Sequence, residues 1–367
     1  MAQALQLAER GLYTTSPNPR VGCVLVRDGK VIGEGWHERA GEPHAEIHAL
    51  RAAADVARGA TAYVTLEPCS HHGRTPPCAD ALIAAGVARV VVAMQDPNPL
   101  VAGQGISKLR AAGIAVECGL MEAAARELNI GFFTRMTRGT PWVRSKIAAS
   151  LDGRTALGNG ESQWITGPAA RQDVQHWRAR ACAVLTGIGT VLADDPQLNV
   201  RNIETTRQPL RAVVDNGLRL PPDARLLNSR PSPASGRGDG GEGGVVVYTA
   251  IPDAQKSAAL AQAGAHVVVL SDVNGSVDVA AVLRDLASRG CNEVLVEAGS
   301  KLNGSLLKAG LIDELVLYLA PQMLGDMARG MARLGELTSL DQRVELEWND
   351  VRQVGRDLRI VARVKKG

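Results

Sequence analysis

Three residues with metal-binding side chains, His44, Cys69 and Cys78, lie near one another in the sequence, and Glu46 follows the first of them by two positions. Imidazole nitrogen and thiolate sulfur are ligands that zinc prefers, and three protein ligands leave a fourth position open, as in catalytic zinc sites. Zinc lowers the pKa of a water molecule, and a nearby carboxylate can carry the proton of that water to a leaving amine. An H-x-E pattern followed by a Pro-Cys pair and a second cysteine is typical of zinc-dependent deaminases.

Two other interpretations of these residues stay open. The first is a structural zinc site, which would need a fourth ligand but would not explain Glu46. The candidates for that ligand are His48, His71 and His72. In the second, Cys69 and Cys78 are ordinary buried thiols in a core without metal. The spacing also differs from the common deaminase pattern, because eight residues separate the two cysteines where two are usual.

Polar residues also gather in the second half of the chain, at the expected ends of strands. Residues 294–315 run from a strand through a Gly/Ser/Asn-containing turn over Gly299–Ser305 into an amphipathic helix, and the backbone N–H groups of Gly299, Ser300 and the following residues would face an anion such as a pyrophosphate. Residues 146–156, 160–180 and 187–201 are rich in Lys, Arg, Asp, Ser and Thr, as a site for a small polar molecule would be. No G-x-G-x-x-G sequence follows a strand in this half, and it contains no Walker A sequence. A plain strand-to-helix connection and a non-catalytic binding or regulatory domain therefore stay open.

Composition narrows the class of protein. The length of 367 residues predicts two domains. A net charge of only +3 and an aromatic content of 3% argue against a nucleic-acid binder held by charge and stacking. Six cysteines are too few for a disulfide framework, and the N-terminus lacks the apolar core of a signal peptide. No apolar run approaches the length of about 18 residues that a membrane helix needs. We therefore expect a cytoplasmic protein that binds neither nucleic acid nor membrane.

Alternating strands and helices must position these residues. Two apolar runs around Asp28-Gly29 predict a hairpin, and helices are expected to begin near His44 and near Cys78. Two helix breakers at residues 138–141 mark a domain boundary, so we expect domains over residues 1–142 and 143–367. Residues 229–244, rich in Gly, Ser and Pro, are predicted to be a flexible insertion. The last forty or so residues carry no usable motif.

The first half resembles the deaminase half of the bifunctional deaminase–reductase family of riboflavin biosynthesis. The resemblance rests on PNPRVGCVLV, GEPHAEIHAL, TLEPCSHHGRTPPC and MQDPNPLVAGQG, and in this family the long insert between the cysteines is normal. It implies a cytidine-deaminase-like, three-layer αβα fold and deamination of diaminohydroxyphosphoribosylaminopyrimidine by water. It further implies one zinc ion held by His44, Cys69 and Cys78, with Glu46 as the catalytic residue. The implied substrate-binding residues are Asn18, His37, His71 and Arg74, the last near the ribose phosphate.

The second half is similar to the reductase half of the same family through ASLDGRTA, ESQWIT, TVLADDPQLNVR, VVD and VEAGSKL. This similarity implies a dihydrofolate-reductase-like α/β fold that uses NADPH to reduce the ribosyl group to a ribityl chain. The implied substrate-binding residues are Lys146, Ser162, Arg178, Leu198, Arg201 and Glu297. Arg178 and Arg201 are the natural anchors for the phosphate. The implied cofactor-binding residues are Ala148, Trp164, Thr190, Asp194, Asn216, Gly299, Ser300, Lys301, Leu302, Asn303, Gly304 and Ser305. Asn216 stands where the family often has serine.

The resulting prediction is one enzyme with two active sites that act in succession on one phosphoribosylated pyrimidine, in a homo-oligomer. Two rival classes remain. A nucleic-acid-editing deaminase, such as a tRNA adenosine deaminase, would need a basic groove and aromatic contacts to a flipped base. A zinc-stabilised binding protein without catalysis would unfold its first domain on chelation and turn nothing over.

Overall fold

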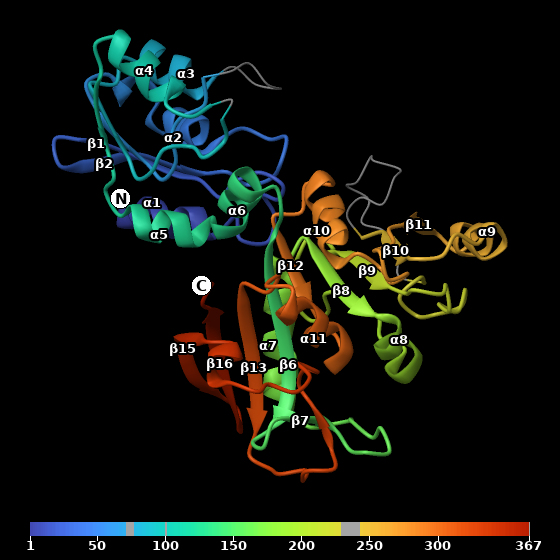
Figure 1. The fold of residues 1–367 in the computed structure, drawn as a ribbon. Coiled ribbons are helices and arrows are strands. Elements are labelled where there is room, and N and C mark those ends of the chain that lie inside the picture. Colours follow the sequence, from blue (N-terminus) through green and yellow to red (C-terminus); the bar gives the residue numbers. More distant parts are fainter. Residues whose placement is uncertain (71–76, 100, 229–242, 367) are drawn as a thin grey trace. The chain divides into compact units, whose positions relative to one another are not determined.

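The computed structural model describes residues 1–70, 77–99, 101–228 and 243–366, and the chain divides into two units, Met1–Gly139 and Thr140–Gly367. We call these unit 1 and unit 2 (Figure 1). The predicted break at residues 138–141 lies at the end of helix α6 (Ile130–Arg138), where Gly139 adopts a φ of 69°. Such a left-handed residue is a common way for a helix to end.

Unit 1 is built on a five-stranded sheet of order β2-β1-β3-β4-β5. Its strands are β1 (Gly22–Arg27), β2 (Lys30–Trp36), β3 (Thr61–Val64), β4 (Arg89–Val92) and β5 (Ala115–Cys118). Strands β3, β4 and β5 are parallel, whereas β1 pairs antiparallel with both β2 and β3. The predicted hairpin is confirmed, because β1 and β2 are joined by Asp28 and Gly29, which both have positive φ as a type I′ turn requires.

Helices flank this sheet. They are α1 (Ala2–Glu9), α2 (Ala45–Ala53), the 3₁₀ helix η1 (Ala54–Ala57), α3 (Cys78–Ala84), α4 (Gln104–Ala111), α5 (Glu122–Leu128) and α6. The predicted helix starts near His44 and Cys78 are confirmed. Helix α2 lies very close to β2, since a Cβ added to Gly35 would come within 2.4 Å of the Ala45 carbonyl oxygen. Small residues at this contact therefore fix the start of α2 against the sheet.

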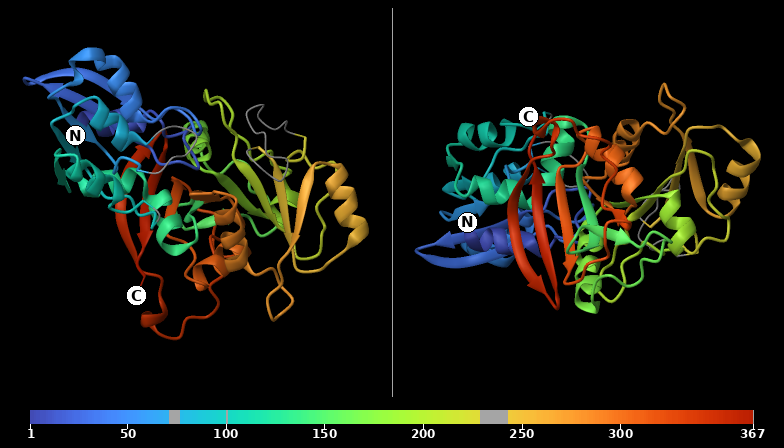
Figure 2. Two further views of the ribbon diagram at one scale, coloured as in Figure 1. Left: turned by 90° about the horizontal axis from the view of Figure 1, so that it is seen from above. Right: turned by 60° about the horizontal axis from the view of Figure 1, so that its bottom comes forward.

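Unit 2 contains a nine-stranded sheet of order β11-β10-β9-β8-β12-β6-β13-β16-β15 and a short β14-β7 pair. Its strands are β6 (Trp142–Ser150), β7 (Arg154–Ala156), β8 (Ala183–Gly187), β9 (Leu210–Val214), β10 (Val245–Thr249), β11 (Ala265–Val269), β12 (Glu293–Val296), β13 (Glu314–Ala320), β14 (Arg329–Gly330), β15 (Leu346–Val354) and β16 (Asp357–Val364). From β11 to β13 all neighbours are parallel, and β16 and β15 continue the sheet antiparallel (Figure 2).

The helices of unit 2 are α7 (Pro168–Arg180), α8 (Ile188–Asp194), α9 (Ala254–Gln262), α10 (Val279–Ser288), α11 (Ser300–Lys308) and the 3₁₀ helix η2 (Leu340–Gln342). Apolar residues of the central strands form the main core, which includes Leu185, Tyr248 and Val296. Both units thus have the mixed α/β folds expected from the sequence. Among the described residues, no helix combines the length and the apolar character needed to cross a bilayer.

Two parts of the fold were not anticipated. Strands β15 and β16 occupy the C-terminal segment for which the sequence suggested no motif, and most side chains of β15 are exposed, so no apolar alternation marks it. The segment that follows β5 forms two helices, α5 and α6, which meet at Asn129. The Asn129 side chain is buried and bonds the backbone of Arg20 through both its oxygen and its nitrogen. Most of the insertion expected at 229–244 lies outside the described residues.

Candidate active sites

The ligand atoms of His44, Cys69 and Cys78 converge in unit 1, all within 4.8 Å of one another. His44 Nδ1 lies 3.3 Å from Cys78 Sγ and 3.6 Å from Cys69 Sγ. A tetrahedral zinc ion, with bonds of about 2.0 Å to nitrogen and about 2.3 Å to sulfur, places such ligands about 3.6 Å apart. The donor set and its distances therefore fit zinc. Within the part of the chain that the structure describes, no fourth metal-binding side chain joins the cluster.

The starts of two helices and the segment that follows a strand bring these ligands together. His44 is the N-cap residue of α2, Cys78 is the first residue of α3, and Cys69 follows β3. Cys69 also closes the start of α3, because its Sγ accepts from the Cys78 N–H (3.3 Å) and its carbonyl accepts from the Ala79 N–H (3.1 Å). Hydrogen bonds from Cys78 and His44 lower the pKa of Cys69 to about 4, although burial opposes them. The thiolate, which is the form that binds metal, is thus favoured.

Glu46 is a buried carboxyl group beside the cluster, with 3% of its surface exposed. Burial raises the pKa of Glu46 to about 6, although the nearby positive charge of His44 lowers it. Its Oε2 atom has no hydrogen-bond partner among the described residues. A carboxyl group with a pKa close to neutrality and an open oxygen is suited to accept and release a proton near neutral pH.

Among the described residues, no other histidine considered as a ligand belongs to the cluster. His48 lies one helical turn after His44, but it is not a member of the cluster, and its Nε2 atom is buried without a partner in the described part of the chain. His71, His72 and Arg74 lie outside the described residues, so their roles stay predictions.

Asn18 and His37 form a hydrogen-bonded pair next to the cluster. Asn18 Nδ2 lies 3.0 Å from His37 Nε2, and His37 Nδ1 lies 3.2 Å from the Pro43 carbonyl oxygen. The His37 ring meets the His44 ring edge-on, with 5.2 Å between centroids. Burial lowers the pKa of His37 to about 4. The ring is therefore neutral, with Nδ1–H donating to Pro43 and Nε2 accepting from the Asn18 amide.

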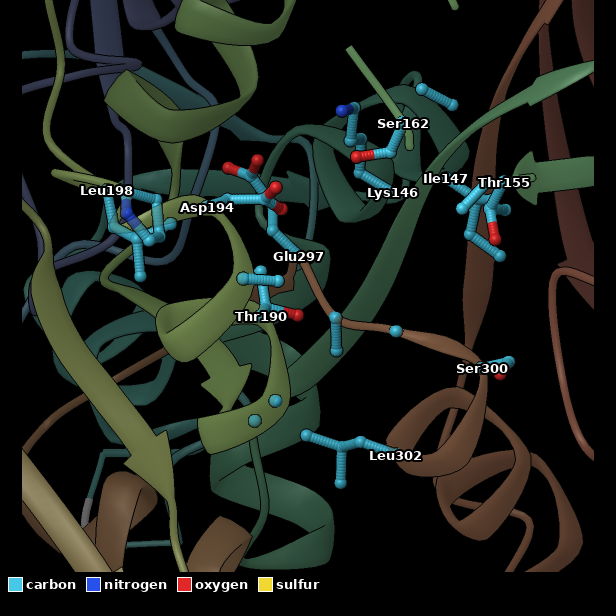
Figure 3. A pocket seen from close by; sticks show the side chains of 18 of the residues that line it. Lys146, Ile147, Thr155, Ser162, Thr190, Asp194, Leu198, Glu297, Ser300 and Leu302 are labelled. Atoms are coloured by element: carbon cyan, nitrogen blue, oxygen red, sulfur yellow. The ribbon is translucent and has the colours of Figure 1, made fainter. Parts of the chain in front are cut away.

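Unit 2 contains a cavity of about 2110 Å³. Ligand pockets usually measure about 300–1,000 Å³, so this one has room for a cofactor and a second ligand together. It lies along the carboxyl ends of the parallel strands, the usual ligand site of such sheets. Gly187 is the last residue of β8, Asn216 follows β9 and Glu297 follows β12, and all three line the cavity. Figure 3 shows the side chains of Glu297 and Asp194 projecting into the same part of it.

Most residues predicted for the reductase site line this one cavity. They are Lys146, Ala148, Ser162, Trp164, Arg178, Thr190, Asp194, Leu198, Arg201, Asn216, Glu297, Gly299, Ser300, Lys301, Leu302 and Ser305. They come from distant parts of the sequence that the fold brings together. The polar set chosen from the sequence is thus a spatial cluster.

Asn303 and Gly304 are placed differently. The predicted turn over Gly299–Ser305 is in fact the first part of helix α11, and only one side of a helix can face a cavity. The Asn303 amide nitrogen donates to the carbonyl oxygens of Ala298 (3.1 Å) and Met331 (3.2 Å). A Cβ on Gly304 would come within 2.3 Å of the Arg333 carbonyl oxygen. Both residues therefore hold α11 in place and do not line the cavity.

A buried ion pair lies at the centre of the cavity wall. Arg178 donates from Nε to Glu297 Oε1 (2.6 Å) and from Nη2 to Glu297 Oε2 (2.9 Å), and its Nη1 donates to the Asn199 carbonyl (3.1 Å). Burial alone would raise the pKa of Glu297, but the positive charge of Arg178 holds it below the usual value. Burial lowers the pKa of Lys146, against the attraction of Glu297. Lys146 Nζ makes no hydrogen bond to any described residue, so its amine is available to a ligand.

Sequence reasoning missed several cations of this cavity. Nine Lys or Arg residues line it, against four Asp or Glu residues, which favours anionic ligands. The additional ones are Arg171, Arg219, Arg225, Arg329 and Arg333. Their segments carry no shared motif, so no local signal could have linked them. The Arg171 guanidinium stacks on the ring of Trp164 at 4.5 Å, and Trp164 is 66% exposed at the cavity.

Two family descriptions match the chain and divide it in the same way. Residues 1–94 match the cytidine and deoxycytidylate deaminase zinc-binding region, and residues 141–360 match the RibD C-terminal domain. The first match contains His44, Glu46, Cys69 and Cys78, and the second contains all residues that line the cavity in unit 2.

Full-length relatives show the same pairing of domains. The chain is 49% identical to the riboflavin biosynthesis protein RibD of Escherichia coli K12, covering 98% of this chain and 96% of that protein. It is 45% identical to RibD of Haemophilus influenzae, over 98% and 95% of the two chains. The solved structure of Acinetobacter baumannii RibD is 47% identical, with a TM-score of 0.89 over 100% of this chain and 98% of that one. A diaminohydroxyphosphoribosylaminopyrimidine deaminase/5-amino-6-(5-phosphoribosylamino)uracil reductase from Thermotoga maritima is 35% identical, with a TM-score of 0.85 over 100% and 97%.

Proposed function

The chain belongs to the RibD family of bifunctional riboflavin-biosynthesis proteins, and we propose that unit 1 deaminates diaminohydroxyphosphoribosylaminopyrimidine and unit 2 then reduces the ribosyl group of the product with NADPH. The observation that carries this proposal is the pairing of two different sites in one chain. Unit 1 has a His/Cys/Cys cluster beside a buried carboxyl group, and unit 2 has a large cavity lined by cations.

In unit 1, we propose that His44, Cys69 and Cys78 hold zinc, which when bound lowers the pKa of a water molecule and so supplies a nucleophile at neutral pH. Glu46 accepts a proton of the attacking water and delivers it to the amino group, which leaves as ammonia. The amidine carbon of the ring gains oxygen and loses nitrogen, so the product is a uracil-type ring. Asn18 is placed to bind the substrate beside this centre, with its amide oriented by His37.

In unit 2, NADPH supplies the hydride that reduces the acceptor carbon. The acceptor is the ribosyl C1′ carbon in the ring-opened, imine-like form, and Lys146 is placed to donate a hydrogen bond or a proton to this group from its unpartnered Nζ. Arg178 keeps Glu297 ionised. The negative charge of Glu297 in turn favours the protonated form of Lys146, because it opposes the lowering of the lysine pKa by burial. The start of α11 at Gly299 and Ser300 offers free N–H groups to the pyrophosphate of the cofactor.

For the substrate phosphate, we propose Arg201 and Arg225 as the anchors. The sequence pointed to Arg178 and Arg201, but three N–H groups of Arg178 are engaged by Glu297 and Asn199. Burial and the charges of Arg178 and Arg225 lower the pKa of Arg201, and no described carboxylate forms an ion pair with Arg201 or Arg225. Two neighbouring cations without a counterion suit a phosphate, which can accept from both.

We also propose that the chain forms a homo-oligomer in the cytoplasm. Strand β15 is an edge strand of the nine-stranded sheet, and it exposes Trp348 (63%) and Val351 (53%), an apolar surface suited to a second copy of the chain. None of the six cysteines, which all lie in the described part of the chain, forms a disulfide, in keeping with a reducing compartment. Sedimentation of the wild type and of a Trp348→Lys variant tests the assembly, and a wild type that stays monomeric at micromolar concentration contradicts it.

The experiment that tests the proposed function measures two products separately. The protein is incubated with the phosphoribosylated diaminopyrimidine, with and without NADPH, and ammonia release and NADPH oxidation are followed. We expect ammonia in both reactions and NADPH oxidation only after deamination. Ammonia released from an unpaired base of a tRNA anticodon loop, and not from the pyrimidine substrate, would favour a nucleic-acid-editing deaminase. No turnover of either substrate would favour a zinc-stabilised binding protein.

A further inference from the structure

A buried carboxylate two residues before the ligand Cys69 plays no part in the chemistry described so far. Glu67 is 4% exposed and lies within unit 1 between β3 and the cysteine. No lysine or arginine pairs with it among the described residues; its partners are backbone N–H groups. A buried charge without compensation is costly, so the surroundings of Glu67 must supply that compensation.

Four backbone N–H groups do so, all from the segment 96–106. Oε1 accepts from Gly105 (2.9 Å) and Ile106 (3.1 Å), and Oε2 accepts from Gly103 (2.9 Å) and Asp96 (3.2 Å). A carboxylate is the side chain that accepts at both oxygens without carrying a donor. Each oxygen of the Glu67 side chain therefore accepts two hydrogen bonds from the backbone.

Two of these donors, Gly105 and Ile106, belong to the first turn of α4, and a third, Gly103, directly precedes the helix. Helix α4 begins after Gly103, which is the N-cap residue and has no side chain to cap the helix. Glu67 provides the missing cap from another part of the chain, and its negative charge also interacts favourably with the helix dipole. The contact is close, because a Cβ on Gly105 would come within 1.9 Å of the Pro68 carbonyl oxygen.

The segment Glu67-Pro68-Cys69 thus connects two helix starts. Its first residue caps α4, and its last residue accepts from the first N–H groups of α3 through Sγ and the carbonyl oxygen. Proline between them restricts the backbone dihedral φ, so little freedom remains for the cysteine. The position of Cys69 Sγ in the cluster is set by this double attachment.

We propose that Glu67 is a positioning residue for the metal site: by capping α4 it fixes the backbone that carries Cys69. This inference rests on the proposed zinc site of unit 1. In a Glu67→Gln variant the side chain keeps its size, but an NH2 group replaces one of the two carboxylate oxygens. This NH2 group is a donor and would face two backbone N–H donors. Loss of such an outer contact typically weakens metal affinity by about 10–100-fold.

The test compares zinc release from three full-length variants loaded with one zinc ion per chain. A chromophoric chelator reports the rate of release, and Co²⁺ substitution reports the thiolate-to-cobalt absorption bands. We expect Glu67→Gln and Gly105→Ala to release zinc at least about tenfold faster than the wild type and to shift the cobalt bands. Gly105→Ala leaves Glu67 in place but forces α4 away from the Pro68 carbonyl oxygen. It therefore tests the attachment of the Glu67-Pro68-Cys69 segment to α4 even if Glu67→Gln folds poorly.

The matched control is Thr65→Val. Thr65 is fully buried in the same segment, and its Oγ1 accepts from the Gly22 N–H at 3.1 Å, away from α4. We expect this variant to lower the melting temperature of unit 1 but to release zinc at the wild-type rate. If Glu67→Gln and Gly105→Ala released zinc at rates within about twofold of the Thr65→Val rate, the inference about Glu67 would be overturned, whereas the proposed zinc site would still stand. A wild type that binds no zinc would overturn both.

Discussion

The two sites of this chain are built in opposite ways. In unit 1, three ligand atoms lie within 4.8 Å, and the residues that carry them are held by two helix starts. In unit 2, a cavity of about 2110 Å³ is lined by residues from many elements, with cations and carboxylates spread along its walls. The first arrangement suits a reacting centre at one point, whereas the second has room for two extended ligands side by side. Substitution of a metal ligand should therefore have an all-or-none effect in unit 1, whereas substitution of a cavity residue should have a graded effect in unit 2.

Removal of the metal should give the largest contrast. Dialysis against a chelator, or the substitution Cys69→Ser, should abolish ammonia release because the ligand set of unit 1 is lost. NADPH oxidation with the deaminated intermediate as substrate should continue at the wild-type rate. Metal analysis should give about one zinc per chain beforehand. Equal loss of both activities would mean that the two sites are not separate.

The substitution Glu46→Gln should reduce deamination by about 10²–10⁴-fold, because the amide cannot accept the proton of water. Zinc content and NADPH oxidation should be unchanged. The measurement is ammonia release with zinc determined on the same sample. Loss of zinc in this variant would show that Glu46 is a ligand or a structural group.

Substitution of Glu297 by glutamine should lower kcat/KM for reduction by about 100-fold, because Arg178 and Lys146 lose the charge that orders them. Deamination should not change. Since the pKa of Glu297 is lowered in the folded chain, its carboxylate stabilises unit 2 above the unfolded pKa of about 4.3, and this contribution is lost as pH falls through the folded value. The difference in free energy of unfolding between wild type and Glu297→Gln should therefore shrink below about pH 4. A difference that grows on acidification would contradict the pairing.

Arg225→Gln should raise KM for the substrate of unit 2 by about tenfold with little change in kcat, because one of two phosphate contacts is lost. The affinity for NADPH should stay the same. Arg352→Gln is the matched control, because Arg352 pairs with Asp350 on β15 and does not line the cavity. An Arg225→Gln variant with unchanged KM but weaker NADPH binding would move this arginine to the cofactor.

The smallest effect is expected from deletion of residues 231–241. Their composition is typical of a segment that forms no packed element, so both activities should stay within about twofold of the wild type. Gly243 is retained in this deletion, because its carbonyl oxygen accepts from Arg211. A collapse of NADPH binding would show that the segment belongs to the site.

The same contrast explains what the sequence could predict. His44, Glu46, Cys69 and Cys78 could be identified because their types and short spacings reflect metal chemistry directly. The cap that Glu67 places on α4 could not, since its partners lie 29 to 39 residues further along the chain. In unit 2, the resemblance identified most cavity residues, but Asn303 and Gly304 were wrongly placed in a turn that proved to be a helix with an inward face.

Long-range placement accounts for the other omissions. Arg219 and Arg225 follow β9, and Arg329 and Arg333 lie near β14, so only the folded sheet brings them to one cavity. Strand β16 was missed although Leu358, Ile360 and Ala362 alternate with Arg359, Val361 and Arg363, and its pairing with β13 joins residues 39 to 49 positions apart. The engagement of Arg178 by Glu297 likewise arises from two distant elements, α7 and the end of β12.

Isotopic labelling of the final product tests the central claim most directly. The wild-type protein is given the phosphoribosylated diaminopyrimidine in water enriched in oxygen-18, with NADPH deuterated at both C4 positions, and the product is examined by mass spectrometry. Two successive reactions on one molecule predict a product that carries one oxygen-18 atom on the ring and one deuterium atom on C1′ of the ribityl chain. A ribityl product without oxygen-18, or a deaminated product that never gains deuterium, would contradict the account.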